Sequence, residues 1–284
     1  MSTPVLSLNQ ATTRGFGLIE TAEAAAAAGI TQIGLWTDPV EDIGLARTQK
    51  LLADTGLGVS SVCRIGFVAD KRGAALQAAL DEVKAAIELS AAVGSPMLTF
   101  IAGGLPEADR SIANAEARVT EALATLVPYA QDAGIRLALE PLHPLFVGDR
   151  SMVTTVAQAH RVVRDLPSDA VGILIDAYAT WWDPDLAESL ALAGDRIAGF
   201  QVNDFALPLP LPENMNGRLF PGDGVIDLPA MVDAVLAAGY TGAIEVEIFN
   251  DEIWAMPLQR IVERTIESYN KHVIGHFALQ GADK

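Results

Sequence analysis

The stretch Gly134-Ile-Arg-Leu-Ala-Leu-Glu140 decides the fold, because it holds the pattern that recurs along the whole chain. A glycine ends a long Ala- and Leu-rich segment, a short aliphatic run follows, and a carboxylate closes it. Glycine suits the left-handed backbone that ends helices. A short buried aliphatic run is typical of a strand in a parallel sheet. We therefore expect a helix to end at Gly134 and a strand to cover 135–140.

The same alternation continues in both directions. The expected strands cover residues 4–8, 31–36, 57–63, 96–101, 135–140, 171–176, 196–203 and 243–249, and the expected helices cover about 16–28, 39–54, 71–93, 108–132, 151–165, 184–193, 228–238 and 251–272. Helix-ending glycines recur at Gly29, Gly56, Gly94, Gly134 and Gly239. Eight such units in about 250 residues predict an α/β fold, a single (β/α)8 TIM barrel. An open doubly wound sheet is the alternative, but no Gly-x-Gly-x-x-Gly follows an early strand.

Composition excludes several classes of protein. The 284 residues are 50% hydrophobic, carry a formal net charge of −17 and include one cysteine, Cys63. A disordered chain, a disulfide scaffold and a nucleic-acid binder are all disfavoured. No window resembles a signal peptide or a membrane span. We expect one TIM-barrel domain over 1–284 in the cytoplasm, with a long functional loop over 205–226 and a C-terminal tail from about 273 to 284.

Oxygen-bearing side chains stand at or near the C-terminal ends of four consecutive strands. They are Glu140, Asp176, Gln201 and Glu247. In a TIM barrel these ends meet at the active-site face, and carboxylate and carbonyl oxygens suit Mg²⁺ or Mn²⁺. The alternative for each residue is a helix cap or a partner for an arginine.

Glu245 belongs to the same strand as Glu247 but lies deeper. Side chains alternate along a strand, so both glutamates point into the barrel if Ile244, Val246 and Ile248 face the helices. Arg136 has the matching inward parity, and an interior ion pair with Glu245 is expected.

The motifs at these strand ends resemble those of the xylose isomerase-like barrel superfamily, which holds sugar phosphate isomerases and epimerases and several dehydratases. The matching pieces are Leu139-Glu140-Pro-Leu-His143-Pro, Ile175-Asp176-Ala-Tyr178, Phe200-Gln201-Val-Asn203-Asp204 and Gly242-Ala-Ile-Glu245-Val-Glu247. The resemblance implies a divalent metal on Glu140, Asp176, Gln201 and Glu247. Gln201 replaces the usual histidine, and its neutral amide oxygen favours Mn²⁺ or Mg²⁺ over Zn²⁺. Ala179 replaces another histidine that contacts substrate in many relatives.

The resemblance also implies proton abstraction next to a carbonyl, with Glu140 and Glu247 on opposite faces of a keto-sugar or polyol. The products would be those of an isomerase or epimerase. The alternative is a lyase or dehydratase, cleaving a 3-keto-glycoside or dehydrating a dehydroshikimate- or inosose-type compound, with His143 as the base. A second alternative is a degenerate barrel that binds a sugar or a partner protein without catalysis.

The remaining candidates would contact the substrate. Trp36, together with Trp181 or its neighbour Trp182, could stack on a sugar ring. Arg64 and Arg218 could bind substrate oxygens, and Arg218 could instead anchor its loop to Asp223. Because few basic residues are expected near the mouth, an unphosphorylated small-molecule sugar is favoured. No nucleic acid or membrane partner is expected, whereas a homo-oligomer or a hetero-subunit role is possible.

Overall fold

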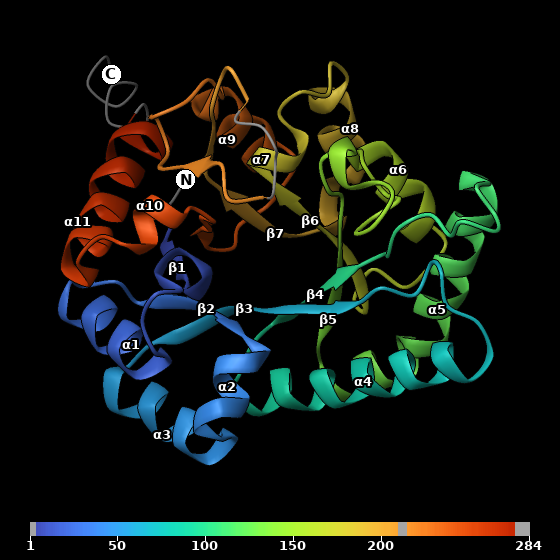
Figure 1. Cartoon of the computed structure of the whole chain (residues 1–284), viewed down its shortest axis with the longest axis horizontal. Helices are drawn as coiled ribbons and strands as arrows, with labels where there is room; N and C mark the ends of the chain where they lie inside the picture. Colours follow the sequence, from blue (N-terminus) through green and yellow to red (C-terminus); the bar gives the residue numbers. More distant parts are fainter. Residues whose placement is uncertain (1–3, 210–214, 276–284) are drawn as a thin grey trace.

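Eight parallel strands close into a barrel at the centre of the molecule, with helices packed around it (Figure 1). The computed structural model describes residues 4–209 and 215–275. The barrel strands are β1 (Leu6–Asn9), β2 (Gln32–Trp36), β3 (Gly58–Gly66), β4 (Met97–Ile101), β5 (Arg136–Glu140), β6 (Val171–Asp176), β7 (Ile197–Val202) and β10 (Ile244–Val246). Each lies within two or three residues of an expected strand, so the TIM barrel is confirmed and the open sheet is excluded.

Helices follow the strands around the outside of the barrel. The α-helices are α1 (Leu18–Ala27), α2 (Thr37–Ile43), α3 (Leu45–Thr55), α4 (Gly73–Ala92), α5 (Ile112–Ala133), α6 (Val156–Val163), α7 (Ala177–Thr180), α8 (Leu186–Ala193), α9 (Leu228–Ala237), α10 (Asp251–Trp254) and α11 (Leu258–Ser268). Shorter helical turns are η1 (Gln10–Thr13), η2 (Pro144–Phe146), η3 (Gly194–Arg196) and η4 (Tyr269–Val273). Among the described residues no helix combines the length and the apolar character needed to cross a bilayer.

Helix boundaries explain where the expected elements differ from the observed ones. All five helix-ending glycines have positive φ, from 66° at Gly134 to 102° at Gly239. Gly44, with φ of 84°, splits the expected helix 39–54 into α2 and α3. Pro257 lies between α10 and α11, because proline lacks the N–H that would continue the helix.

The expected loop over 205–226 is not entirely irregular. Asp204–Phe205 (β8) and Arg218–Leu219 (β9) pair as a two-stranded antiparallel sheet. Residues 210–214 of this loop and 276–284 of the expected tail lie outside the described part of the chain.

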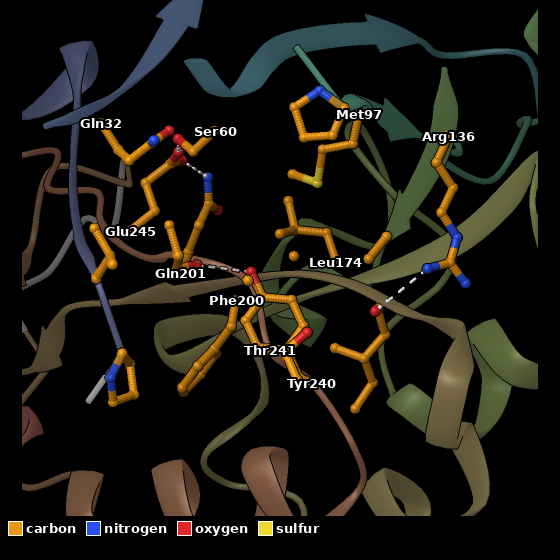
Figure 2. A pocket seen from close by; sticks show the side chains of 18 of the residues that line it. Gln32, Ser60, Met97, Arg136, Leu174, Phe200, Gln201, Tyr240, Thr241 and Glu245 are labelled. Carbon is orange, nitrogen blue, oxygen red and sulfur yellow. Dashed lines mark hydrogen bonds between the residues drawn. The ribbon is translucent and has the colours of Figure 1, made fainter. Parts of the chain in front are cut away.

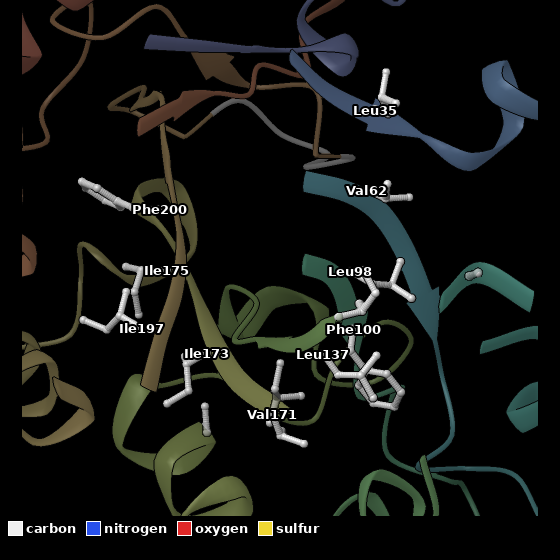
Figure 3. Close-up of a cluster of buried hydrophobic side chains, with 14 of the residues drawn as sticks. Leu35, Val62, Leu98, Phe100, Leu137, Val171, Ile173, Ile175, Ile197 and Phe200 are labelled. Carbon is white, nitrogen blue, oxygen red and sulfur yellow. The ribbon is translucent and has the colours of Figure 1, made fainter. Parts of the chain in front are cut away.

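The main core lies between the barrel and the helices (Figure 3), as alternation along buried strands predicts. In β10 and the residues after it, Ile244, Val246 and Ile248 pack in this core, while Glu245 and Glu247 each line a cavity inside the barrel. The expected parity of this strand is therefore confirmed.

Strand register aligns the polar ends. Asp176 pairs with Gln201 across β6 and β7, and Gln201 pairs with Glu245 across β7 and β10. The barrel thus brings these side chains to neighbouring positions although they are far apart in sequence.

Candidate active site

A cavity of about 250 Å³ opens at the C-terminal ends of the strands. Active sites of TIM barrels lie at this end. Five residues that the sequence nominated line it: Trp36, Arg64, Glu140, Arg218 and Glu247. Asp176 is completely buried and reaches the cavity through its contact with Arg218.

Asp176 is fixed by three groups. Its Oδ1 accepts hydrogen bonds from the backbone N–H of Tyr178, which lies in α7, and from Nδ2 of Asn203, both at 2.9 Å. Its Oδ2 lies 2.9 Å from Nη1 of Arg218. Asp176 therefore caps the short helix α7 and also pairs with Arg218. Helix capping and pairing with an arginine were the two alternatives to metal binding for a carboxylate at a strand end.

Arg218 joins two of the nominated carboxylates. Its Nη1 lies 2.7 Å from Oε2 of Glu247 and 2.9 Å from Oδ2 of Asp176. The β8–β9 pairing carries it there, and only 2% of the residue is exposed. The alternative that Arg218 binds Asp223 is wrong, because Asp223 pairs with Arg264 at 2.7 Å.

The two glutamates of the cavity resist ionisation. Burial, with the charges of Asp176 and Glu247, raises the pKa of Glu140 well above its usual range. Burial raises the pKa of Glu247 to about 7, although the charge of Arg218 opposes the shift. Arg218 forms ion pairs with two of the three buried carboxylates, so full ionisation leaves negative charge on Glu140 that no ion pair among the described residues compensates.

Gln201 lies beneath this cluster and is oriented by Glu245. Its Nε2 donates to Oε1 of Glu245 at 2.8 Å, whereas its Oε1 is buried and has no hydrogen-bond partner in the described part of the chain. Glu245 also accepts from Asn9, at 2.7 Å, and from the hydroxyls of Ser60 and Ser61. An amide held in this way presents its oxygen as a free acceptor.

The expected ion pair between Glu245 and Arg136 is wrong. Arg136 is the first residue of β5, at the opposite rim of the barrel, and its Nη2 donates to the backbone oxygen of Asp195 at 2.7 Å. Figure 2 shows Arg136 and Glu245 on opposite sides of a second cavity, of about 760 Å³, at the N-terminal end of the barrel. The carboxylate of Glu245 instead accepts hydrogen bonds from neutral donors, namely Asn9, Ser60, Ser61 and Gln201.

Four side chains near the strand ends carry oxygen donors. Glu140, Asp176 and Glu247 offer carboxylate oxygens, and Gln201, which lines the cavity at the N-terminal end of the barrel, offers the amide oxygen that has no partner among residues 4–209 and 215–275. Oxygen donors of this kind suit Mg²⁺ and Mn²⁺. The Sγ of Cys63 adds a further donor, within 4.8 Å of oxygens from Glu245 and Glu247. Burial and these two charges raise the pKa of the Cys63 thiol, which disfavours the thiolate that binds metals.

His143 and Trp181 lie in an aromatic cluster beside the cavity. The His143 ring stacks on Phe205 at 5.7 Å between centroids and lies 6.0 Å from Tyr178, and Trp181 contacts Phe205 at 5.1 Å. The Nδ1 of His143 accepts from the backbone N–H of Leu145 at 3.3 Å. Burial lowers the pKa of His143, which favours the neutral imidazole. Neither side chain is among those that line the cavity.

Comparison with known proteins identifies the family. A family model described as xylose isomerase-like TIM barrel matches residues 22–272. The chain belongs to this family. The crystal structure of a protein from Sinorhizobium meliloti superposes with a TM-score of 0.89 at 36% identity, covering 94% of this chain and 98% of that one.

Two curated relatives of this xylose isomerase-like barrel have named activities. The 3-dehydroshikimate dehydratase of Pseudomonas putida is 26% identical over 86% of this chain and 38% of its own length. The inosose isomerase of Bacillus subtilis is 28% identical over 56% of this chain and 56% of its own length. The matched regions thus span about two fifths and just over half of these proteins.

Three further residues belong to the cavity of this xylose isomerase-like barrel, although the sequence did not single them out as site residues. Arg14, Cys63 and Arg150 also line the cavity. With Arg64 and Arg218 the cavity has four arginines, so the expectation of few basic residues at the mouth is wrong. Arg14 and Arg150 lie in connections after β1 and β5, where side-chain alternation makes no prediction. A basic residue soon after a barrel strand is the signal that could have found them.

Proposed function

We propose that the protein is an isomerase or epimerase that moves a proton next to the carbonyl of a small polyhydroxylated keto compound. Glu140 and Glu247 would be the catalytic residues, one accepting the proton and the other donating. The observation that carries the proposal is that both glutamates line one buried cavity and both have raised pKa values. A carboxyl group with a raised pKa holds its proton more readily and can both take and give one during a reaction.

The electrostatics of the cluster support unequal protonation of the pair. Arg218 forms ion pairs with two of the three buried carboxylates, Asp176 and Glu247, and burial disfavours the charged form of both glutamates, so a state in which one glutamate keeps its proton is favoured. Arg218 forms an ion pair with Glu247, whereas within the described residues it forms none with Glu140, so the two glutamates have different environments. Arg218 would then bias which of them ionises first.

We propose that Glu140, Asp176, Gln201 and Glu247 hold a divalent cation, Mn²⁺ or Mg²⁺ in preference to Zn²⁺. The Gln201 oxygen, unpartnered within the described residues, supports this assignment. A cation bound there supplies Lewis-acid polarisation of a substrate carbonyl. Trp36 lines the cavity and provides a flat apolar surface for the substrate.

A lyase or dehydratase is the second candidate, favoured by the match to a dehydratase over 86% of this chain. His143 would be its base, and the lowered pKa keeps the imidazole neutral at pH 7. Its ring is packed on Phe205, so access to substrate would require the neighbouring loop to move.

The test is solvent deuterium exchange. Protein is treated with chelator, resupplied with Mn²⁺ or Mg²⁺, and incubated in D₂O with a panel of ketoses and keto-polyols, which are followed by NMR. Deuterium at the carbon next to the carbonyl, lost in Glu140→Gln and Glu247→Gln, supports the proposal, and the product identifies an isomer, an epimer or an elimination. Glu82→Gln, an exposed position on α4, is the control. Exchange that persists in both glutamate variants would overturn the assignment, and no exchange with any substrate would favour a non-catalytic barrel.

A further inference from the structure

Three arginines line the mouth without a role in the proton-transfer cluster. Arg218 is committed to Asp176 and Glu247, but Arg14, Arg64 and Arg150 line the same cavity and do not form ion pairs with these carboxylates in the described part of the chain. They come from separate segments, after β1, in β3 and after β5.

Arg64 has no carboxylate within ion-pair distance among residues 4–209 and 215–275. Its guanidinium instead lies over the rings of Trp36, at 5.3 Å, and Phe67, at 5.2 Å. The residue is half-buried. A stacked guanidinium keeps its in-plane N–H groups available, and these suit a planar anion.

Arg14 and Arg150 extend the same basic surface. Arg14 lies over Trp36, at 5.6 Å, and is exposed. The carboxylate near Arg150 is that of its exposed neighbour Asp149, at 3.9 Å. Burial and the charge of Arg150 lower the pKa of Arg64, although the charges of Glu140 and Glu247 oppose the shift, so Arg64 lies near both Arg150 and the two glutamates.

This arrangement is unusual for a chain with 36 acidic and 19 basic residues. Carboxylates are plentiful, yet Arg14 and Arg64 lie over aromatic rings and Arg150 pairs loosely with the exposed side chain of Asp149. Like charges placed together are unfavourable unless an anion joins them. The cavity is also polarised, because Glu140 and Glu247 are buried whereas Arg14 is exposed and Arg64 and Arg150 are partly so.

From these observations, and resting on the proposed function, we propose that the substrate is a small keto acid whose carboxylate binds Arg64 and Arg150, with Arg14 at the rim. Its carbonyl end then faces Glu140 and Glu247. A volume of about 250 Å³ admits only a small molecule, since sites for drug-sized ligands hold about 300–1,000 Å³.

A carboxylate fits better than a phosphate ester. Phosphate sites of TIM barrels are commonly built from backbone N–H groups in the loops after strands 7 and 8. The three arginines instead follow or belong to β1, β3 and β5, and they offer planar side chains. The proposed acid is unphosphorylated, as the sequence analysis expected, although that expectation assumed few basic residues at the mouth.

Calorimetric binding of three matched probes tests the proposal without requiring turnover. The probes are D-gluconate, D-glucitol and D-glucitol 6-phosphate, each titrated into the chelated and the Mn²⁺-supplied protein. We expect gluconate to bind at least tenfold more tightly than glucitol. Arg64→Gln and Arg150→Gln should each remove most of this difference by weakening gluconate binding. Arg64→Lys, which keeps the charge but loses the planar fork, should have an intermediate effect.

Arg164→Gln is the matched control, because Arg164 ends α6 and pairs with Asp165 at an exposed position. Equal affinity for gluconate and glucitol, or no gluconate binding, would overturn the proposal. So would tighter binding of the phosphate ester than of gluconate. If gluconate preference is found but polyhydroxylated keto acids added to the D₂O panel show no deuterium exchange, the acid site stands and the proposed reaction fails. If neutral ketoses exchange but gluconate is not preferred, the proposed reaction stands and the acid site fails.

Discussion

Glu247→Gln should change how stability depends on pH, because Glu247 is a buried carboxylate that pairs with Arg218 together with Asp176. Its folded-state pKa is raised from 4.5 to about 7, chiefly by burial. An acid with a raised folded-state pKa binds more protons in the folded protein than in the unfolded chain between these two values. The contribution of Glu247 to the free energy of unfolding is therefore highest below pH 4.5. This contribution falls as the pH rises from 4.5 to about 7.

The size of this effect follows from the pKa values. A rise from 4.5 to about 7 corresponds to about 3.5 kcal/mol, at about 1.4 kcal/mol per pKa unit. Glutamine does not ionise, and its amide oxygen can still accept from Arg218. The variant should escape most of this loss between pH 5 and 8. Removing the charge also relieves Glu140, whose pKa Glu247 helps to raise, so the slope flattens further.

The assay is urea unfolding of wild type and variant in chelator at pH 5, 6, 7 and 8. The quantity compared is the difference in unfolding free energy between the two proteins, which removes the pH dependence they share. We expect this difference to shift in favour of Glu247→Gln by about 2–3 kcal/mol from pH 5 to pH 8. The exposed control Glu82→Gln should show no such shift. A difference that is constant with pH would refute the reasoning that burial raises this pKa.

Three further predictions concern the neighbours of this group. Arg218→Met leaves Asp176 and Glu247 without their shared cation and should cost about 3–5 kcal/mol in urea unfolding at pH 8; a cost under about 1 kcal/mol would show that the buried pairs matter little. Gln201→His should raise Mn²⁺ or Zn²⁺ affinity in calorimetry, since imidazole is a stronger donor than an amide, and unchanged affinity would place residue 201 outside the metal site. His143→Ala should spare metal binding but remove any elimination activity measured by NMR, and unchanged elimination would leave His143 with a packing role.

The barrel was predictable because its signals are local. A short aliphatic run after a helix-ending glycine defines each strand, and the positive φ at Gly134 is the conformation that such a glycine adopts. Alternation then places Glu245 and Glu247 inside the barrel. Boundaries such as Gly44 were harder, because a glycine within a helical pattern can be tolerated or can end the helix.

The partners of the inward side chains were not predictable in the same way. Parity indicates that Arg136 and Glu245 both point inward, but not that they lie at different heights in the barrel. Arg136 begins β5 and turns to the backbone oxygen of Asp195 at the N-terminal rim. The position of Arg218 depends on the antiparallel pairing of Phe205 with it, which joins two ends of a long loop. Such contacts are set by tertiary packing rather than by periodicity.

The hydrogen bond to Glu245 explains how a glutamine can take the place of the histidine that is usual at position 201. A histidine that donates one ring N–H to a carboxylate leaves its other nitrogen as an acceptor. Gln201 reproduces this division, because Nε2 donates to Glu245 and Oε1 has no partner within the described residues. Glu245 in turn accepts from Asn9, Ser60 and Ser61, and as an acceptor it holds the amide with its nitrogen toward the carboxylate. Gln201 is thus held with its amide oxygen left as an acceptor, and it is held by Glu245, the residue for which the sequence suggested Arg136 as a partner.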